Sequence, residues 1–193
     1  MSNIINIALV GVGGQGTLLA SQVIARAAML SGLDVKQSEV HGMAQRGGSV
    51  VSQVRIGKKV YSPLIPNGQT DFLLSFEQLE SLRYADTLAE TGTALINRQL
   101  IMPVTVSSGQ QPGLDDLDAR LDRAFPRKIL IDALKLAEEL GNIRTVNMIM
   151  TGTLSTLLTL DESSWRTAIQ DCAPARHVEV NQRAFTRGRE VGV

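Results

Sequence analysis

The sequence predicts an α/β fold, a three-layer sandwich built on a mostly parallel but mixed sheet. Three observations support this class. An apolar, β-branched run at 4–10 leads through glycines into an amphipathic stretch at 17–31, which is the order strand, loop, helix. Residues 49–56 alternate apolar and polar side chains as a strand does. The last third of the chain has the apolar spacing of helices.

The first forty residues predict one βαβ unit. The strand at 4–10 is apolar throughout, as a strand buried on both faces would be. The helix at 17–31 ends where Gly32 can adopt the backbone conformation that stops a helix. A second, more polar strand is expected at 33–40.

A β-hairpin is expected directly after this unit. The strand at 49–56 follows without an intervening helix, and the turn at 57–59 leads into a short apolar segment at 60–62. Pro63 and Pro66 would end that segment. The hairpin makes the predicted sheet mixed.

Strands and helices alternate again in the middle of the chain, and its last third is predicted to be helical. An apolar strand at 71–76 precedes an amphipathic helix at 77–88. Short strands are expected at 93–96 and 104–106. Helices are then expected at 129–140, 145–160, 164–173 and 178–189.

Length and composition limit the partners. With 193 residues, 44% of them hydrophobic, the chain can bury one core, and we expect a single domain, 1–193. Basic and acidic residues both number 19, so no net charge attracts nucleic acid or an anionic membrane surface.

The single cysteine, Cys172, forms no internal disulfide. No basic, apolar leader precedes the first strand, and we expect a cytoplasmic protein.

A glycine-rich loop joins the first strand to the first helix: Gly11-Val12-Gly13-Gly14-Gln15-Gly16. In that position the G-x-G-x-x-G spacing is typical of a Rossmann-like fold that brings a phosphate to the helix start. Glu39, near the end of the second strand, could bind a ribose hydroxyl. A stand-alone NAD(P)- or FAD-binding enzyme therefore remains an alternative. The other interpretation is that the glycines only allow close packing, and the hairpin in place of a second helical crossover argues against a dinucleotide.

A second glycine-bearing loop, residues 41–48, concentrates several kinds of reactive or binding side chain. Beside Glu39, its candidate ligand or interface residues are His41, Gly42, Gln45, Arg46, Gly47 and Gly48. The adjacent glycines could present backbone N–H groups to an anion, and Arg46 could bind a phosphate or carboxylate. His41 could change its charge near neutral pH. A local Arg46–Glu39 ion pair in a solvated loop is the alternative.

The two glycine-bearing runs, Gly11 to Gly16 and Glu39 to Gly48, together resemble the paired signature of the gamma domain of pyruvate- and 2-oxoacid:ferredoxin oxidoreductases. Within that family the chain is most similar to beta subunits of the indolepyruvate type. The likeness follows element order along the whole chain, although its specific motifs lie in the first third. It implies an accessory subunit, with no catalytic residue of its own, of a complex that converts an aryl 2-oxoacid to its acyl-CoA and reduces ferredoxin.

The resemblance also implies where the cofactors lie. Such complexes use thiamine diphosphate with Mg²⁺ and iron–sulfur clusters, with CoA as co-substrate. This chain has no Gly-Asp-Gly motif with an Asn-rich metal turn, and Cys172 alone cannot ligate a cluster. We therefore expect these cofactors in a larger alpha subunit, the expected partner, and none bound by this chain alone. Both glycine-bearing loops are expected together at the carboxyl edge of the sheet, facing the alpha subunit's active site or its CoA channel.

Overall fold

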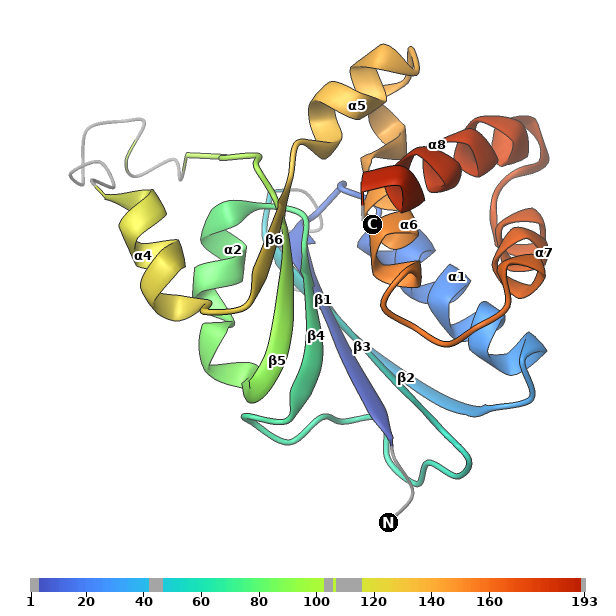
Figure 1. Ribbon diagram of the computed structural model, residues 1–193, viewed down its shortest axis with the longest axis horizontal. Helices are drawn as coiled ribbons and strands as arrows, with labels where there is room; N and C mark the ends of the chain where they lie inside the picture. The colour runs from blue at the N-terminus through green and yellow to red at the C-terminus, as the bar shows by residue number, and fades with distance from the viewer. Residues whose placement is uncertain (1–3, 42–46, 103–105, 107–115, 192–193) are drawn as a thin grey trace.

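A six-stranded mixed sheet lies at the centre of this computed structural model, which describes residues 4–41, 47–102, 106 and 116–191 (Figure 1). Its strands are β1 (Ile5–Val12), β2 (Asp34–His41), β3 (Ser49–Gly57), β4 (Thr70–Ser75), β5 (Leu88–Asn97) and β6 (Lys128–Ile131). They lie in the order β2-β3-β1-β4-β5-β6. β1, β4, β5 and β6 are parallel, whereas β3 is antiparallel to β1 and β2. The predicted mixed sheet is confirmed.

Helices cover both faces of this sheet. They are α1 (Thr17–Leu30), α2 (Gln78–Arg83), α4 (Leu117–Ala124), α5 (Ala133–Glu139), α6 (Val146–Ser155), α7 (Glu162–Cys172) and α8 (Val178–Val191), with 3₁₀ turns η1 (Ala85–Thr87), η2 (Ile143–Thr145) and η3 (Ala175–His177). Alternation along β1 sends Ile7 and Leu9 to the layer of α1, α6, α7 and α8, and Ala8 and Val10 to the layer of α2 and α4. The predicted three layers are confirmed. Within the described residues, no helix is long and apolar enough to cross a membrane.

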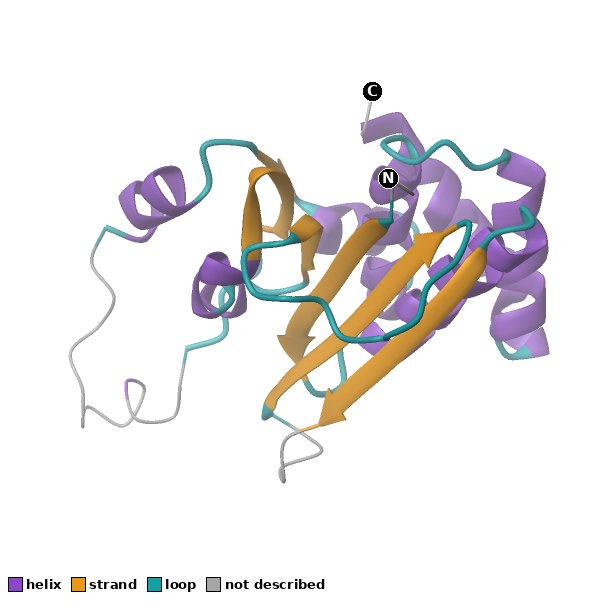
Figure 2. Cartoon of the chain, turned by 90° about the horizontal axis from the view of Figure 1, so that it is seen from below, coloured by secondary structure: helices purple, strands orange, loops and turns teal. Residues whose placement is uncertain are grey.

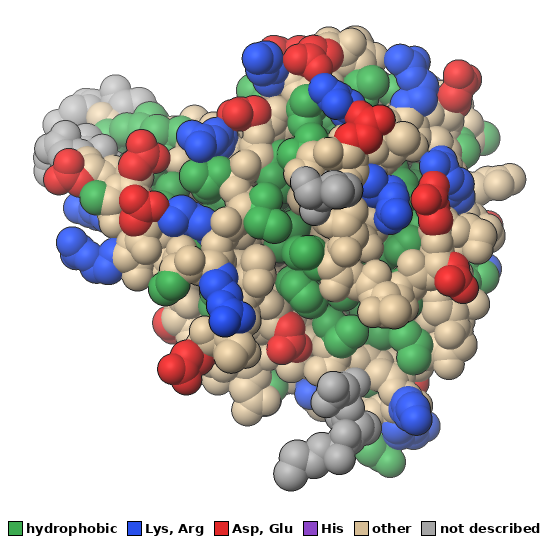
Figure 3. Space-filling model, viewed as in Figure 1, with side chains coloured by type: hydrophobic (Ala, Val, Ile, Leu, Met, Phe, Trp, Pro, Cys, Tyr) green, Lys and Arg blue, Asp and Glu red, His purple; other side chains and the backbone are tan. Residues whose placement is uncertain are grey.

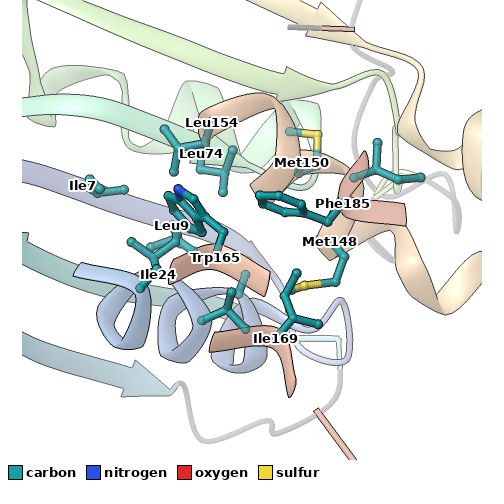
Figure 4. Packing of buried hydrophobic residues seen from close by; sticks show 14 of the residues in the cluster. Ile7, Leu9, Ile24, Leu74, Met148, Met150, Leu154, Trp165, Ile169 and Phe185 are labelled. Carbon is teal, nitrogen blue, oxygen red and sulfur yellow. The ribbon is translucent and has the colours of Figure 1, made fainter. Parts of the chain in front are cut away.

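The larger core lies between the sheet and the C-terminal helices (Figure 4). Trp165 of α7 and Phe185 of α8 meet there with ring centroids 5.7 Å apart. All ten residues of α6 are buried, and α6 crosses α8 at two facing glycines. A Cβ atom on Gly152 would run into the carbonyl oxygen of Phe185, and one on Gly188 into that of Ile149. The two backbones can pack this closely only because both positions lack a side chain.

The hairpin lies earlier in the chain than predicted. The expected strand at 60–62 is wrong, because β3 already has β1 along one edge and β2 along the other. The hairpin is instead the antiparallel pair β2–β3, and β3 separates the two strands of the predicted βαβ unit. Residues 58–69 cross the sheet on the face that α2 and α4 also cover (Figure 2), and Ile65 packs there against the smaller core. On this face the Arg55 guanidinium donates to the carbonyl oxygens of Ser62 and Leu64, both over 3.0 Å.

Two other predicted elements differ from the structure. The helix expected at 129–140 begins only at α5, because the apolar run Lys128–Ile131 pairs in parallel with β5 as strand β6. The helix expected at 77–88 ends at Arg83, after which η1 leads into β5. Of the strand expected at 104–106, only Val106 lies within the described residues, and it is not in a strand.

The face of the molecule in Figure 3 carries acidic and basic side chains next to one another. The described residues include exposed ion pairs, such as Arg187 with Glu190 over 2.8 Å and Arg26 with Asp171 over 2.8 Å. Exposed pairs of this kind contribute little to stability.

Candidate functional site

The first glycine loop, residues 11–16, owes its shape to glycine at several positions. Gly14 and Gly16 have φ values of 106° and 81°, which side-chain-bearing residues rarely adopt. Gly16 begins α1, and its carbonyl oxygen accepts a hydrogen bond from the amide of Asn147 over 3.2 Å. A Cβ atom on Gly16 would collide with that amide, and one on Gly11 would lie 3.2 Å from the Cβ of Phe76. The loop is therefore packed tightly against α6 and the end of β4.

Gln15 turns its side chain back into the protein. Its Oε1 accepts a hydrogen bond from the backbone N–H of Val12 over 2.7 Å. Its Nε2 donates to the carbonyl oxygen of Phe76 over 3.2 Å and to Oε1 of Gln99 over 3.1 Å. Phe76 follows β4 and Gln99 follows β5, so this one side chain links the glycine loop to the carboxyl ends of two neighbouring strands. Through these hydrogen bonds, the Gln15 side chain holds the loop in place.

The two glycine-bearing loops lie together at the carboxyl edge of the sheet. The backbone N–H of Gly13 donates to the carbonyl oxygen of Gly48 over 2.8 Å, and the N–H of Gly47 donates to the carbonyl oxygen of Gly13 over 3.5 Å. Gly47 has a φ of 77°, again in the left-handed region. Gly42, Gln45, Arg46 and the side chain of His41 lie outside the described residues, so their predicted role stays a prediction.

Glu39 is not where a dinucleotide site needs an acidic residue. It lies opposite Ser52 of β3, which lies opposite Leu9 of β1. Two strand spacings, roughly 10 Å, therefore separate Glu39 from the middle of β1, and it does not lie next to the glycine loop. Its carboxylate instead accepts hydrogen bonds from Gln37 over 3.1 Å and from Ser21 of α1 over 3.4 Å. In the Rossmann arrangement the second strand lies directly beside the first, and here β3 occupies that place.

Two buried carboxylates at α2 bind chain segments near the carboxyl edge of the sheet, the segment at Ile101 and the start of β3 at Ser49. Glu77 caps α2 by accepting from the N–H of Glu80 over 2.8 Å, and it also accepts from the N–H of Ile101 over 2.9 Å. Glu80 accepts a hydrogen bond from the hydroxyl of Ser49, the residue after Gly48. Burial raises the pKa of Glu77, although the backbone N–H groups that bind it act in the opposite direction.

A cavity of about 320 Å³ opens beside the first glycine loop. Its lining residues are Gly14, Gln15, Gly16, Gln99, Leu134, Ile143, Arg144 and Val146. These residues offer no carboxylate, imidazole, hydroxyl or thiol, so they can bind and position a group but not transfer its protons. Gln99 and Arg144 were not among the predicted site residues. Gln99 follows a parallel strand that ends at the same edge of the sheet as β1. Because open α/β sheets bind ligands at this edge, a search for polar residues just after such strands could have found it. No local motif marks Arg144.

Metal-ligating side chains and the thiol of Cys172 are the other groups that could carry chemistry. Within the described part of the chain, no group of three or more His, Cys, Asp and Glu side chains could hold a metal ion. Cys172 packs, partly buried, against the larger core. Burial, together with the carboxylate of Asp171, raises the pKa of its thiol, which lowers its reactivity.

Comparison with protein families gives one match over nearly the whole chain. The matching model covers residues 6–191 and describes the pyruvate ferredoxin/flavodoxin oxidoreductases.

Individual relatives and a solved structure agree with that match. The chain is 42% identical over 188 residues to the indolepyruvate oxidoreductase subunit IorB of Thermococcus kodakarensis, which covers 95% of this chain and 93% of that protein. It is 30% identical over 193 residues to the 2-oxoglutarate synthase subunit KorC of Methanocaldococcus jannaschii, covering 96% and 92%. The structure of the gamma subunit of a keto/oxoacid ferredoxin oxidoreductase from Geobacter sulfurreducens PCA is similar, with a TM-score of 0.73, 26% identity, and coverage of 97% and 98%.

Proposed function

Because the chain belongs to the pyruvate ferredoxin/flavodoxin oxidoreductase family, we propose that it is the accessory, gamma-type subunit of a 2-oxoacid:ferredoxin oxidoreductase. The complex would oxidatively decarboxylate indolepyruvate or another aryl 2-oxoacid, transfer the acyl group to CoA and reduce ferredoxin. Residues 1–193 would act as one domain, in the cytoplasm.

The observation that carries this proposal is the end-to-end similarity to an indolepyruvate oxidoreductase subunit. The lower identity to a 2-oxoglutarate synthase subunit favours the aryl 2-oxoacid over 2-oxoglutarate. The fold match to a gamma subunit supports the same position in such a complex.

The residues of this chain do not fit the cofactors that the reaction needs. A four-cysteine cluster cannot be built from Cys172 alone, and the chain lacks the thiamine diphosphate motif. Thiamine diphosphate with Mg²⁺ and the iron–sulfur clusters therefore belong, in our proposal, to the alpha subunit. No chemical step is assigned to this chain.

This chain would contribute to the complex through the carboxyl edge of its sheet. The joined glycine loops and the cavity beside them lie where open α/β sheets hold their ligands. In our proposal this edge faces the alpha subunit's active site or its CoA channel. The candidate residues there, Gly11, Gly13, Gly14, Gly16 and the loop 41–48, would shape the channel. The N–H groups of Gly13 and Gly47 would hold the two loops together, since each donates to the other loop.

The alternative, a stand-alone NAD(P)- or FAD-binding enzyme, is not favoured. It requires an acidic residue beside the glycine loop, and Glu39 lies two strands away, bonded to Gln37 and Ser21. Micromolar binding of NAD(P) or FAD to the isolated chain would contradict the proposed function.

Co-expression with the large subunit encoded in the same genome tests the proposal. A tag on this chain should recover a larger polypeptide with the visible absorbance of iron–sulfur clusters, and the pair should reduce methyl viologen with indolepyruvate and CoA. Recovery of this chain alone, with no larger subunit, would count against the proposal.

A further inference from the structure

Asn97, the last residue of β5, has a fully buried side chain at the carboxyl edge of the sheet. Its Nδ2 donates to the carbonyl oxygen of Phe76 over 3.1 Å and to Oε1 of Gln99 over 3.4 Å. Nε2 of Gln15 donates to the same two acceptors, over 3.2 Å and 3.1 Å. Two side-chain amides and two shared acceptors therefore close a ring of hydrogen bonds, which we call the amide ring, next to the first glycine loop.

The direction of each hydrogen bond in the amide ring is fixed. The carbonyl oxygen of Phe76 can only accept, so Gln15 and Asn97 must both turn their NH₂ groups toward it. The same NH₂ groups reach Gln99, whose side chain has to present its oxygen to them. Flipping any of the three amides would place two donors or two acceptors face to face. Each amide in the ring consequently has one allowed orientation.

The oxygen of the Asn97 side chain binds a second part of the cavity wall. Oδ1 accepts a hydrogen bond from the N–H of Ala133, the first residue of α5, over 3.2 Å. Leu134, the next residue, lines the cavity, as Gln15 does. One buried side chain therefore holds the glycine loop through the amide ring and the start of α5 directly.

Packing alone does not require an asparagine at this position. An apolar residue of similar size could fill a buried site at the end of a strand without needing hydrogen-bond partners. A buried asparagine needs them, because an unpaired donor or acceptor in the interior carries its full desolvation cost. When every member is paired, such a network is rigid. The residue is explained by the segments that it holds together.

We propose that Asn97 is a positioning residue for the reaction of the complex. It holds the first glycine loop through Gln99 and Gln15, and the start of α5 through Ala133, in one arrangement before the large subunit binds. Because its side chain is buried, it acts only through the residues that it binds. This inference rests on the proposed function and names the side chain that keeps the carboxyl edge in one conformation.

Amide hydrogen exchange of the purified chain tests the amide ring itself. Gln99→Leu removes the shared side-chain acceptor and should speed exchange of the Val12 N–H, which Gln15 holds, by about tenfold, as expected for the loss of one hydrogen bond. Gln99→Glu is the matched variant, because a carboxylate can accept from both amides as the Gln99 oxygen does. Exchange at Val12 should then stay close to that of the unmodified chain. Equal exchange rates in the two variants would overturn the proposal.

Steady-state kinetics of the reconstituted complex test the positioning role. Asn97→Asp places a carboxylate against two acceptors, and the displaced loop should raise the KM for CoA or for indolepyruvate by roughly tenfold. Asn97→Ala, which removes the same hydrogen bonds without adding a charge, should act in the same direction. Asn181→Asp is the matched control, because Asn181 is also buried and its Nδ2 donates to a carbonyl oxygen, that of His177, outside the ring. It should lower stability and leave both KM values unchanged.

The outcomes separate a positioning role from a structural one. A lower kcat with both KM values unchanged in the Asn97 variants would mean that they only reduce the amount of folded chain, which would overturn the proposal. If the unmodified chain supports no turnover with the large subunit, the proposed function fails and the positioning role with it. Exchange at Val12 would in that case still decide whether the amide ring holds the loop.

Discussion

The backbone N–H of Gly13 donates a hydrogen bond to the carbonyl oxygen of Gly48 over 2.8 Å. This bond joins a loop that follows the central strand β1 to a loop that precedes its antiparallel neighbour β3. Because β3 lies beside β1, the carboxyl end of β1 and the beginning of β3 meet at one edge of the sheet. The same pairing displaces β2, and with it Glu39, from the position a dinucleotide site would need.

Replacing Gly16 with alanine should destabilise the protein for two reasons. A left-handed backbone costs an alanine about 1–2 kcal/mol, and the new methyl group would meet the Asn147 amide. Gly32→Ala is the matched control, since Gly32 has a φ of 78° but nothing within 4 Å of its Cβ position. Urea denaturation should show a loss of unfolding free energy that is larger for Gly16→Ala by about 1 kcal/mol or more. Equal losses would mean that Asn147 does not press on the loop.

Replacing Gly152 or Gly188 with alanine should lower the free energy of unfolding, whereas the same replacement at an ordinary helical glycine raises it. Within a helix, glycine to alanine normally stabilises by about 1 kcal/mol. At the α6–α8 crossing the added methyl group meets a backbone carbonyl oxygen, which cannot move aside as a flexible side chain can. We expect each substitution to lower the free energy of unfolding by about 1–3 kcal/mol, measured by thermal and chemical denaturation. Stabilisation by either substitution would contradict the close crossing.

Gln15→Ala should loosen the first glycine loop. The substitution removes the acceptor for the Val12 N–H and the donor to Phe76 and Gln99. Leaving these groups unpaired should cost about 1–3 kcal/mol of unfolding free energy and speed hydrogen exchange at Val12. Gln22→Ala, at an exposed position of α1, is the control and should change both quantities little. A Gln15→Ala variant as stable as the control would show that the loop does not depend on this side chain.

Glu77 should make stability depend on pH in a defined direction. Burial raises its pKa above the ordinary value of 4.5, so the folded protein holds this proton more tightly than the unfolded chain does. The resulting contribution to the free energy of unfolding is fully present below about pH 4.5 and is lost as pH rises through the folded-state pKa. Urea denaturation between pH 4 and 7 should therefore show a decline in the unmodified protein, relative to Glu77→Gln.

Glu90→Gln controls for the removal of one carboxylate, because Glu90 is exposed on β5. This variant keeps Glu77 and should therefore keep the decline of the unmodified protein. If Glu77→Gln shows the same decline as the unmodified protein, Glu77 does not titrate differently in the folded state.

Local sequence patterns were sufficient for the parts of this fold that local interactions determine. The strand before the first glycine loop, the loop itself and α1 lie where predicted, because their apolar spacing and glycines act within a few residues. The expectation that both glycine-bearing loops share one edge also agrees with the Gly13–Gly48 contact.

The errors came from pairing between distant segments. Strand β6 is short and apolar, and only its pairing with β5 distinguishes it from the start of a helix. The insertion of β3 between β1 and β2 left β3 with no free edge for a strand at 60–62. Arg144 reaches the cavity through the placement of η2 beside the glycine loop, which no motif in the sequence records.

Titration of the purified chain into the purified large subunit tests the central claim most directly. The measured quantity is methyl viologen reduction with indolepyruvate and CoA, recorded at increasing ratios of this chain to the large subunit. We predict no turnover by this chain alone and a rate that rises until the two chains reach a fixed stoichiometry, then stays constant. A large subunit that is fully active without this chain, and unaffected by adding it, would contradict the account.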